Sequence, residues 1–409
     1  MRSNYLWYQF FRYGVVGPAL QMFHSNIKVS GREQIPSDKP VIFVGNHQNA
    51  LMDALHVVTS TQKFVHFLTR AEPFAMPVLR HFFRSLNMMP VYRVRDGFST
   101  IRKNTETFNQ CYRRLGQGDA VLVFAEANHD LRRRVRPLSK GFTRIAFGAE
   151  QEHNWQLDLQ VQPVGLNYGT HQHSQAPVHI QFGPPIAIAD FRGRYQEDER
   201  QAALALKDAA AKELKKVTMH VPDVEQYPFY HLMLDELEPD REKLIHASIA
   251  NRRVAKLSDC VTKQRVGQAD QLMSKRNNAS KIDTNFKLSD FLLSPLYLFS
   301  LLNNAVPYQL VRWVTGNYIE DHVFDASAKF LLGLFGLPVW YILMGIGLGL
   351  AGTSWPAVVS YVLLSTASAP MFVRGRNLLF QTIGWYQEEK DEEPQLKEFR
   401  ELRKSVLED

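Results

Sequence analysis

The chain has 409 residues, with 48 Lys and Arg against 41 Asp and Glu, a net charge of +7 and a pI near 9.2. This length allows one large core plus an accessory region, and the basic charge suits anionic lipid headgroups or phosphorylated substrates. A nucleic-acid partner is not expected, because no nucleic-acid-binding motif is found and the C-terminal third is too apolar. The two cysteines, Cys111 and Cys260, make neither a disulfide framework nor a metal pattern, which predicts a reducing compartment.

The N-terminal segment, residues 1–26, is rich in aromatic side chains but is interrupted by Arg12, two glycines and Pro18. It contains no uninterrupted apolar span of about 20 residues, so it is not expected to cross a membrane. Because Trp and Tyr favour the headgroup level, an interfacial helix is predicted here, with an ordinary helix packed on the domain as the alternative. No signal peptide is predicted.

Strand-like and helix-like segments alternate over residues 27–222. This alternation predicts an α/β domain with a largely parallel sheet flanked by helices. Ligands of such sheets bind beyond the carboxyl ends of the strands. The predicted strands lie at 27–35, 41–44, 64–69, 120–124, 157–168 and 178–182, and a further short strand within residues 87–97 is expected to deliver Arg93 and Arg95 to a loop. Predicted helices lie at 76–86, 99–116, 141–150 and 198–219.

A His and an Asp follow the buried strand predicted at 41–44. His47 comes directly after the strand, and Asp53 lies in an apolar run that reads as the first turns of a helix. An Asp placed there would fix the tautomer of the imidazole and favour the imidazolium. The other ring nitrogen would then be free to take a proton from a substrate hydroxyl. The alternative is a satisfied core His beside a helix-capping Asp.

This pair resembles the active-site motif of the glycerol-phosphate and lysophospholipid acyltransferase family, which is usually His-x4-Asp. Here five residues separate His47 from Asp53, and Met52 stands where the Asp is expected. One added residue turns a helical side chain by roughly 100°. We therefore expect the insertion to be absorbed in the turn after His47 or in a bulge.

The resemblance extends to three further blocks, in the family's order. Arg93 matches an Arg that binds the phosphate of the acceptor, and Glu126 matches a Glu that holds an acceptor hydroxyl. Ala125 and Ala127 replace the Pro and Gly that usually flank this Glu. Lys140 matches the basic residue that ends the family's cationic segment. A surface ion pair is the alternative for Arg93, and a pair with a nearby arginine is the alternative for Glu126.

The cationic run at 131–141 contains four arginines besides Lys140. A run this basic beside an active site would attract phosphate, the donor's carrier and an anionic membrane surface. The pattern does not fix roles for the individual arginines, and Arg132 and Arg134 are interpreted as solvated charges.

The C-terminal half is predicted to hold a charged helical linker at 223–288, a membrane region at 289–376 and a charged tail at 377–409. Disorder is expected near Ser274–Ser280. Two long apolar runs, Phe330 to Ala351 and Trp355 to Val373, predict a transmembrane hairpin at 330–373. Lys329, Arg374 and Arg376 flank it, so the positive-inside rule places both ends in the cytoplasm. Residues 291–314 are interpreted as an interfacial or re-entrant helix rather than a full span.

The resemblance implies acyl transfer to glycerol-3-phosphate or 1-acyl-glycerol-3-phosphate in phosphatidic acid synthesis. With the hairpin and its flanking basic residues, the expected location is the cytoplasmic face of a cell inner membrane. The donor would be acyl-CoA or acyl-carrier protein, with no metal and no bound cofactor. We find no Gly-x-Ser-x-Gly elbow, so direct attack by the acceptor hydroxyl is expected. One alternative is a non-catalytic, membrane-anchored lipid-binding protein. Another is a metal-dependent hydrolase that uses His47, Asp53, Glu126 and His129.

Overall fold

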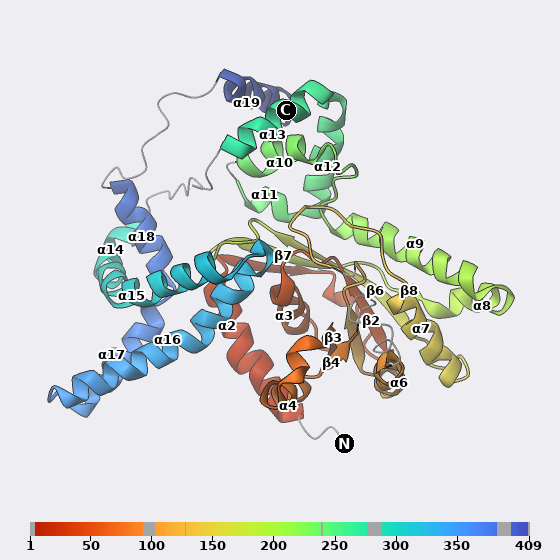
Figure 1. Cartoon of the computed structure of the whole chain (residues 1–409), viewed down its shortest axis with the longest axis horizontal. Coiled ribbons are helices and arrows are strands. Elements are labelled where there is room, and N and C mark those ends of the chain that lie inside the picture. The colour runs from red at the N-terminus through yellow and green to blue at the C-terminus, as the bar shows by residue number, and fades with distance from the viewer. Residues whose placement is uncertain are drawn as a thin grey trace. The chain divides into compact units, whose positions relative to one another are not determined.

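The computed structural model describes residues 5–92, 103–126, 128–238, 240–275, 288–382 and 394–407. The chain divides into two compact units (Figure 1). Unit 1 comprises Met1–His171, Ala176–Val224 and Asp240–Ala255, and unit 2 comprises Gln172–Gln175, Glu225–Pro239 and Lys256–Asp409. Most of the stretch near Ser274–Ser280, for which disorder was expected, lies outside the described residues; helix α13 (Lys263–Lys275) includes Ser274.

Unit 1 is built on a sheet that the described residues form from eight strands. The order across the sheet is β1-β7-β6-β2-β5-β3-β4, and β8 pairs with β6. All pairs are parallel except β6 with β7 and β6 with β8, so the predicted α/β class with a largely parallel sheet is confirmed. The strands are β1 (Asn26–Ser30), β2 (Val41–Gly45), β3 (Val65–Arg70), β4 (Met88–Val91), β5 (Ala120–Val123), β6 (Gln160–Tyr168), β7 (Pro177–Phe182) and β8 (Ile186–Ala187).

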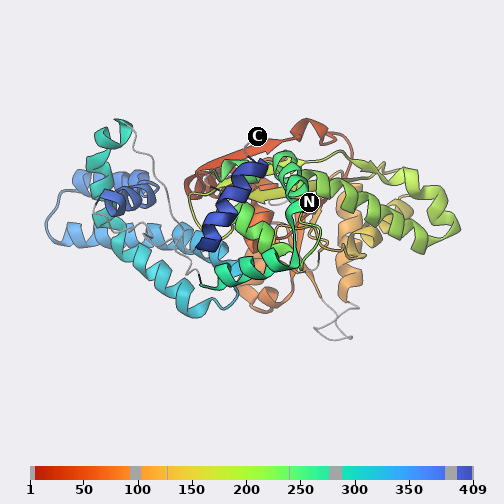
Figure 2. The same ribbon diagram turned by 90° about the horizontal axis from the view of Figure 1, so that it is seen from above.

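Helices cover both faces of this sheet (Figure 1, Figure 2). Alternate residues of the central strand β2 point to opposite faces, as strand geometry requires. Ile42 and Val44 pack with the first group of helices, and Val41 and Phe43 pack with the second. The first group is α6 (Lys103–Gly116), α7 (Gly141–Glu152) and α9 (Glu199–Val217), and the second is α3 (Ala50–Ser60) with the N-terminal segment. Three more helices belong wholly to unit 1: α4 (Pro77–Ser85), α8 (Arg192–Glu197) and α11 (Glu242–Ile245), and α12 (Ala247–Leu257) begins in it.

The N-terminal segment is one continuous helical stretch, Tyr5–Phe23, with a π-helical section in its middle. Its sections are α1 (Tyr5–Gln9), the π-helical section (Phe10–Val16) and α2 (Gly17–Phe23). Tyr8 and Arg12 are buried on one side, where Arg12 donates a hydrogen bond to the carbonyl of Lys63. The other side exposes large apolar side chains, namely Tyr5, Leu6, Trp7, Phe10 and Tyr13. The interfacial role of this segment stays a prediction.

Unit 2 is helical in its described part. Its helices are α10 (Tyr227–His231), α13, α14 (Leu288–Leu292), α15 (Ser294–Tyr318), α16 (Asp325–Leu350), α17 (Trp355–Ser368), α18 (Met371–Thr382) and α19 (Pro394–Leu407). By length and composition, one described helix could cross a membrane, at His322–Leu350, or up to two if the bent pair α17–α18 is one span.

The second arm of the predicted hairpin departs from the sequence prediction. We expected one continuous apolar run over Trp355 to Val373, whereas α17 ends at Ser368 and α18 continues at an angle of 68°. The break consists of Ala369 and Pro370. Proline has no N–H for the helical ladder and restricts the residue before it, which explains the end of α17.

A buried pair of histidines gives unit 1 a predicted dependence of stability on pH. His24 and His56 are 4% and 0% exposed, and their Nε2 atoms lie 3.1 Å apart. The Nδ1 of His24 lies 2.9 Å from the carbonyl of Ala176, to which it donates when neutral. Burial lowers the pKa of His24 to about 4 and lowers the pKa of His56 well below its ordinary value. Both rings are therefore neutral at pH 7.

We expect acidification to destabilise the fold through this pair. Below about pH 6.5 the unfolded histidines bind protons that the folded pair does not, so the free energy of unfolding falls as pH drops towards 4. The shift of His24 alone, from 6.5 to about 4, corresponds to about 3 kcal/mol. Denaturant unfolding at pH 7.5, 6, 5 and 4 measures this loss. His24→Gln retains a donor and an acceptor but does not titrate, so it should reduce the slope, whereas the exposed His81→Gln should not. If the free energy of unfolding of His24→Gln falls with pH as steeply as that of wild type, the pH dependence does not come from this histidine pair.

Candidate active site

The imidazole and the carboxylate predicted to meet are in contact. His47 follows the end of β2, and Asp53 lies in the first turn of α3. The Nδ1 of His47 lies 2.9 Å from Oδ2 of Asp53. The side chain of Asp53 is fully buried, while that of His47 is 16% exposed. The carboxylate is thus shielded from water, and the imidazole remains accessible.

The turn between β2 and α3 absorbs the additional residue of the His-x5-Asp spacing. Asn49 has φ −140°, and Ala50 has φ 43°, which lies in the left-handed region. A non-glycine residue there costs roughly 1–2 kcal/mol. The backbone N–H groups of Gln48 and Asn49 both donate to Oδ2 of Asp53, at 2.9 and 2.8 Å. The strained turn therefore wraps around the carboxylate and brings it to His47.

A tyrosine holds the other oxygen of the same carboxylate. Tyr168, the last residue of β6, donates its hydroxyl to Oδ1 of Asp53 at 2.7 Å. Tyr168 is buried, and burial together with the nearby Asp53 carboxylate raises the pKa of its hydroxyl well above the ordinary value. Asp53 consequently has four partners, with Oδ2 shared by three of them. Its position is fixed from β2, α3 and β6 together.

An aromatic ring fixes the plane of the imidazole. The ring of Phe124 stacks on that of His47, with centroids 4.2 Å apart and an angle of 9° between the planes. The ring of His129 approaches edge-on, with a centroid distance of 5.7 Å. With Nδ1 directed at Asp53, the remaining nitrogen Nε2 is the one able to exchange a proton with a substrate.

Glu126 lies beside His47 because β5 and β2 are parallel neighbours whose carboxyl ends share an edge. Its Oε2 accepts from the backbone N–H of His47 at 3.2 Å and from the guanidinium of Arg136 at 3.0 Å, and its Oε1 accepts from the backbone N–H of Arg136 at 3.0 Å. Burial raises the pKa of Glu126, and the charge and hydrogen bonds of Arg136 oppose this shift. Of the two interpretations of Glu126, the structure shows the pair with a nearby arginine, and its binding of an acceptor hydroxyl stays a prediction.

Of the two other predicted binding residues, Arg93 and Lys140, the structure describes only Lys140. Lys140 is exposed and immediately precedes α7, next to Ser139, whose N–H donates to the carbonyl of Ala125. Arg93 lies outside the described residues. The structure therefore brings His47, Asp53 and Glu126 together and leaves the roles of Arg93 and Lys140 as predictions.

Two arginines of the cationic run behave differently from each other. Arg132 pairs with Asp130 at 2.5 Å on the surface, in keeping with its interpretation as a solvated charge. Arg133 is buried and donates to the carbonyls of Tyr168 and Gly169 at 2.5 and 3.1 Å. Arg133 thereby holds the end of β6, where the Tyr168 hydroxyl reaches Asp53.

Residues 26–167 match the family model described as Acyltransferase, and this range contains the whole cluster from His47 to Lys140. This segment is similar to the acyltransferase family, and the match covers less than half of the chain. The match ends one residue before Tyr168, and it excludes the described helices of unit 2.

The acyltransferase segment is similar to several curated proteins. It is 28% identical to an uncharacterized acyltransferase of Schizosaccharomyces pombe over 30% of this chain and 18% of that protein. It is 26% identical to glycerol-3-phosphate O-acyltransferase 1 of Saccharomyces cerevisiae over 29% of this chain and 16% of that protein. It is 25% identical to a chloroplastic 1-acyl-sn-glycerol-3-phosphate acyltransferase of Arabidopsis thaliana over 29% of this chain and 32% of that protein. The matches thus span at most about a third of these relatives.

One solved structure is also similar to part of this chain. The crystal structure of the 1-acyl-sn-glycerophosphate acyltransferase from Thermotoga maritima aligns with a TM-score of 0.35 and 21% identity. The alignment covers 50% of this chain and 82% of that one.

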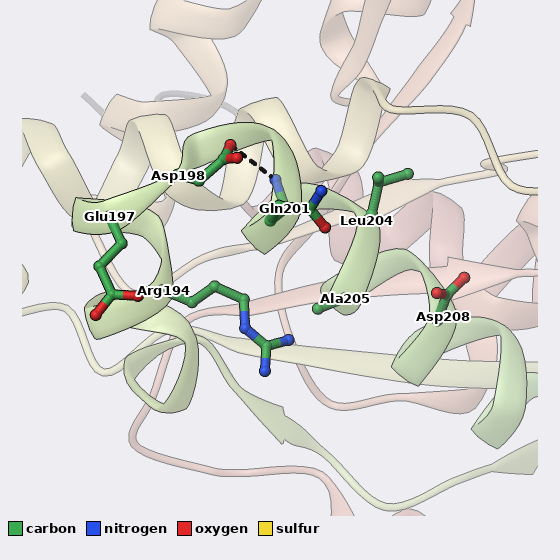
Figure 3. Close-up of a pocket in the computed structure, with 7 residues that line it drawn as sticks. All are labelled: Arg194, Glu197, Asp198, Gln201, Leu204, Ala205 and Asp208. Atoms are coloured by element: carbon green, nitrogen blue, oxygen red, sulfur yellow. Dashed lines mark hydrogen bonds between the residues drawn. The ribbon is translucent and has the colours of Figure 1, made fainter.

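A separate pocket of this chain lies over α8 and α9 (Figure 3). Its side chains are of mixed charge, and Asp198 caps α9 by accepting from the N–H groups of Arg200 and Gln201. This surface lies beyond the matched residues 26–167 and includes neither His47 nor Asp53. The residues around it are Arg194, Glu197, Asp198, Gln201, Leu204, Ala205 and Asp208.

Sequence reasoning missed Tyr168 as the partner of Asp53, and it named a nearby arginine as an alternative partner of Glu126 without identifying Arg136. Tyr168 ends a predicted strand, as His47 does, and that position at a strand end was the available signal. Arg136 stands in a run of arginines in an irregular loop, where sequence periodicity cannot single one out.

Proposed function

We propose that the protein transfers an acyl group from a thioester to a hydroxyl of glycerol-3-phosphate or 1-acyl-glycerol-3-phosphate. The observation that carries this proposal is the contact of 2.9 Å between His47 and a buried, fully hydrogen-bonded Asp53 within an acyltransferase-family segment. The relatives named as glycerol-3-phosphate and 1-acyl-glycerol-3-phosphate acyltransferases support this choice of acceptors.

In this mechanism His47 acts as the general base. Its Nε2 takes the proton of the acceptor hydroxyl while the hydroxyl oxygen attacks the thioester carbonyl carbon. The new C–O bond forms, the C–S bond breaks, and the imidazolium returns its proton to the leaving thiolate. Asp53 holds Nδ1 and stabilises the imidazolium between these two transfers. The products are an ester and a free thiol.

We assign binding of the acceptor to Arg93 and Lys140, with Glu126 at the edge of the same site. An arginine grips a phosphate with two hydrogen bonds, and a lysine adds a point charge. Acyl-CoA and acyl-carrier protein are both suitable donors, since each presents a thioester on an anionic carrier that the basic segment would attract.

We further propose that the reaction takes place at the cytoplasmic face of a cell inner membrane. Helix α16 supports this, because it is long and apolar enough to cross a bilayer. Lys329, Arg374 and Arg376 flank the hairpin, and basic residues favour the cytoplasmic side. An anionic membrane surface is then the natural partner of the net positive chain.

Purified full-length protein should be assayed with labelled acyl-CoA and acyl-carrier protein against glycerol-3-phosphate and 1-acyl-glycerol-3-phosphate. We expect one donor and acceptor combination to give an ester product, and His47→Ala to lower its kcat by about 10³-fold or more, since the general base and its coupled partners act together. If wild type and His47→Ala form equal amounts of product, the proposed catalytic role of the His47–Asp53 pair is wrong. Binding of the lipid without any turnover would favour the non-catalytic alternative, and activity lost with a chelator would favour the metal-dependent one.

A further inference from the structure

Helix α15 in unit 2 exposes an apolar stripe along one side. Leu298, Leu302, Val306 and Leu310 recur every four residues and are 60%, 75%, 58% and 57% exposed. Residues four apart lie on the same face of a helix. No charged residue occurs from 294 to 311. The exposed residues of α15 from 298 to 310 are thus apolar except for Gln309.

The inward face of the same helix is polar. Ser300 and Asn304 are buried, and the Oδ1 of Asn304 accepts from the hydroxyl of Tyr341 on α16 at 2.6 Å. The hydroxyl of Ser300 donates to the carbonyl of Ser368 at 2.8 Å. Asn303 accepts at its side-chain oxygen from Tyr361 on α17. A seam of hydrogen bonds therefore joins α15 to α16 and α17.

Helices α16 and α17 repeat this arrangement. Val339, Ile342 and Ile346 of α16 are more than half exposed, while Gly345 is buried against α17. A Cβ added at Gly345 would lie 3.3 Å from the side chain of Val358, so the two helices approach closely through a small residue. Small residues and interhelical hydrogen bonds are the features by which helices associate within a bilayer.

This polarity is the reverse of that of a helical bundle in water, which buries its leucines and exposes its amides. A bundle surrounded by acyl chains must instead satisfy polar groups internally and present apolar side chains outward. The charge at the start of the bundle is also neutralised, because Asp290 accepts from Arg374 at 2.7 and 2.6 Å and from Tyr297 at 2.9 Å. Trp313 and Tyr318, at the other end of α15, are aromatics of the kind that favour the interface.

We infer that the outer face of α15, together with those of α16 and α17, is embedded in the hydrocarbon of a lipid bilayer, with the Asn303–Asn304 seam as its internal contact. This goes beyond the predicted hairpin, since the sequence analysis interpreted residues 291–314 as an interfacial or re-entrant helix. It does not depend on acyl transfer, because it concerns only what covers α15.

Spin labels at two outer positions test the inference. In full-length Cys111→Ala/Cys260→Ser protein, single Leu302→Cys and Val306→Cys variants are nitroxide-labelled and reconstituted in vesicles of phosphatidylethanolamine and phosphatidylglycerol. The matched control is Lys212→Cys, an exposed position of α9 in unit 1. We expect the ratio of collision rates with oxygen and with a water-soluble nickel complex to be about tenfold higher at 302 and 306 than at 212, because a polar complex is excluded from hydrocarbon.

Two other results would overturn the inference. Equal ratios at 302, 306 and 212 would show that the stripe faces water. Immobile labels that neither reagent reaches would show that protein covers the stripe, as a second copy of this chain would. These readings require no catalysis, so an enzyme inactive in every assay could still give the expected result.

Discussion

Replacing Asp53 with Asn is expected to lower kcat by about 10⁴-fold, because the neutral amide no longer holds His47 in the required tautomer or stabilises its imidazolium. The KM for the acceptor should change little, since the Asp acts on His47 and touches no substrate. Steady-state kinetics with the donor and acceptor found in the assay panel measure both quantities.

The same substitution should also destabilise the domain. Oδ2 of Asp53 accepts from His47 and from two backbone N–H groups, and an amide NH₂ at that position would face donors. Leaving buried donors unpaired costs about 1–3 kcal/mol each. Denaturant unfolding therefore accompanies the kinetics, so that lost activity is assigned only to folded protein.

Tyr168→Phe is the matched comparison for Asp53→Asn. It removes one hydrogen bond to Oδ1 and leaves the carboxylate and its contact with His47 in place. Loss of a hydrogen bond to a charged group is worth about 1.5–3 kcal/mol, so kcat is expected to fall by about 10- to 150-fold at most. A folded Asp53→Asn enzyme that retains a tenth of wild-type activity would contradict the proposed role of the dyad.

The edge of the sheet at which the site lies was predictable, because apolar runs of strand length end directly before polar residues. Val41 to Val44 precede His47, and Ala120 to Val123 precede Glu126. Two parallel neighbouring strands then bring these residues together without further information. The contact between His47 and Asp53 was also predictable, because a carboxylate near an imidazole can fix its tautomer and the additional residue was assigned to the turn.

The means by which the turn takes up that residue could not be predicted, because Ala50 adopts a left-handed conformation that sequence normally signals with glycine or asparagine. Four hydrogen bonds to Asp53 hold the turn, and one of them comes from Tyr168, 115 residues further along the chain. The break at Ala369 and Pro370 was missed for a different reason. Composition alone made the segment look continuous, whereas the proline ends the helix.

Replacing Glu126 with Ala is expected to reduce the free energy of unfolding by about 3–5 kcal/mol, because it leaves the guanidinium of Arg136 partly buried and without its carboxylate. The backbone N–H of His47 loses its acceptor in the same variant, so kcat should fall as well. Denaturant unfolding and steady-state kinetics on the same preparations measure the two effects.

A double-mutant cycle separates the structural role of Glu126 from binding of an acceptor. Arg136→Met keeps an unbranched apolar side chain and removes the charge, and the double variant removes both partners. If the Glu126–Arg136 pair stabilises the turn at His47, the double variant should lose less free energy of unfolding than the two single variants lose in sum, by about 1–3 kcal/mol. If Glu126 serves the acceptor instead, Glu126→Ala should raise the KM for the acceptor while stability stays near that of wild type. Because Glu126 is nearly inaccessible and both of its oxygens are engaged, we expect the first result.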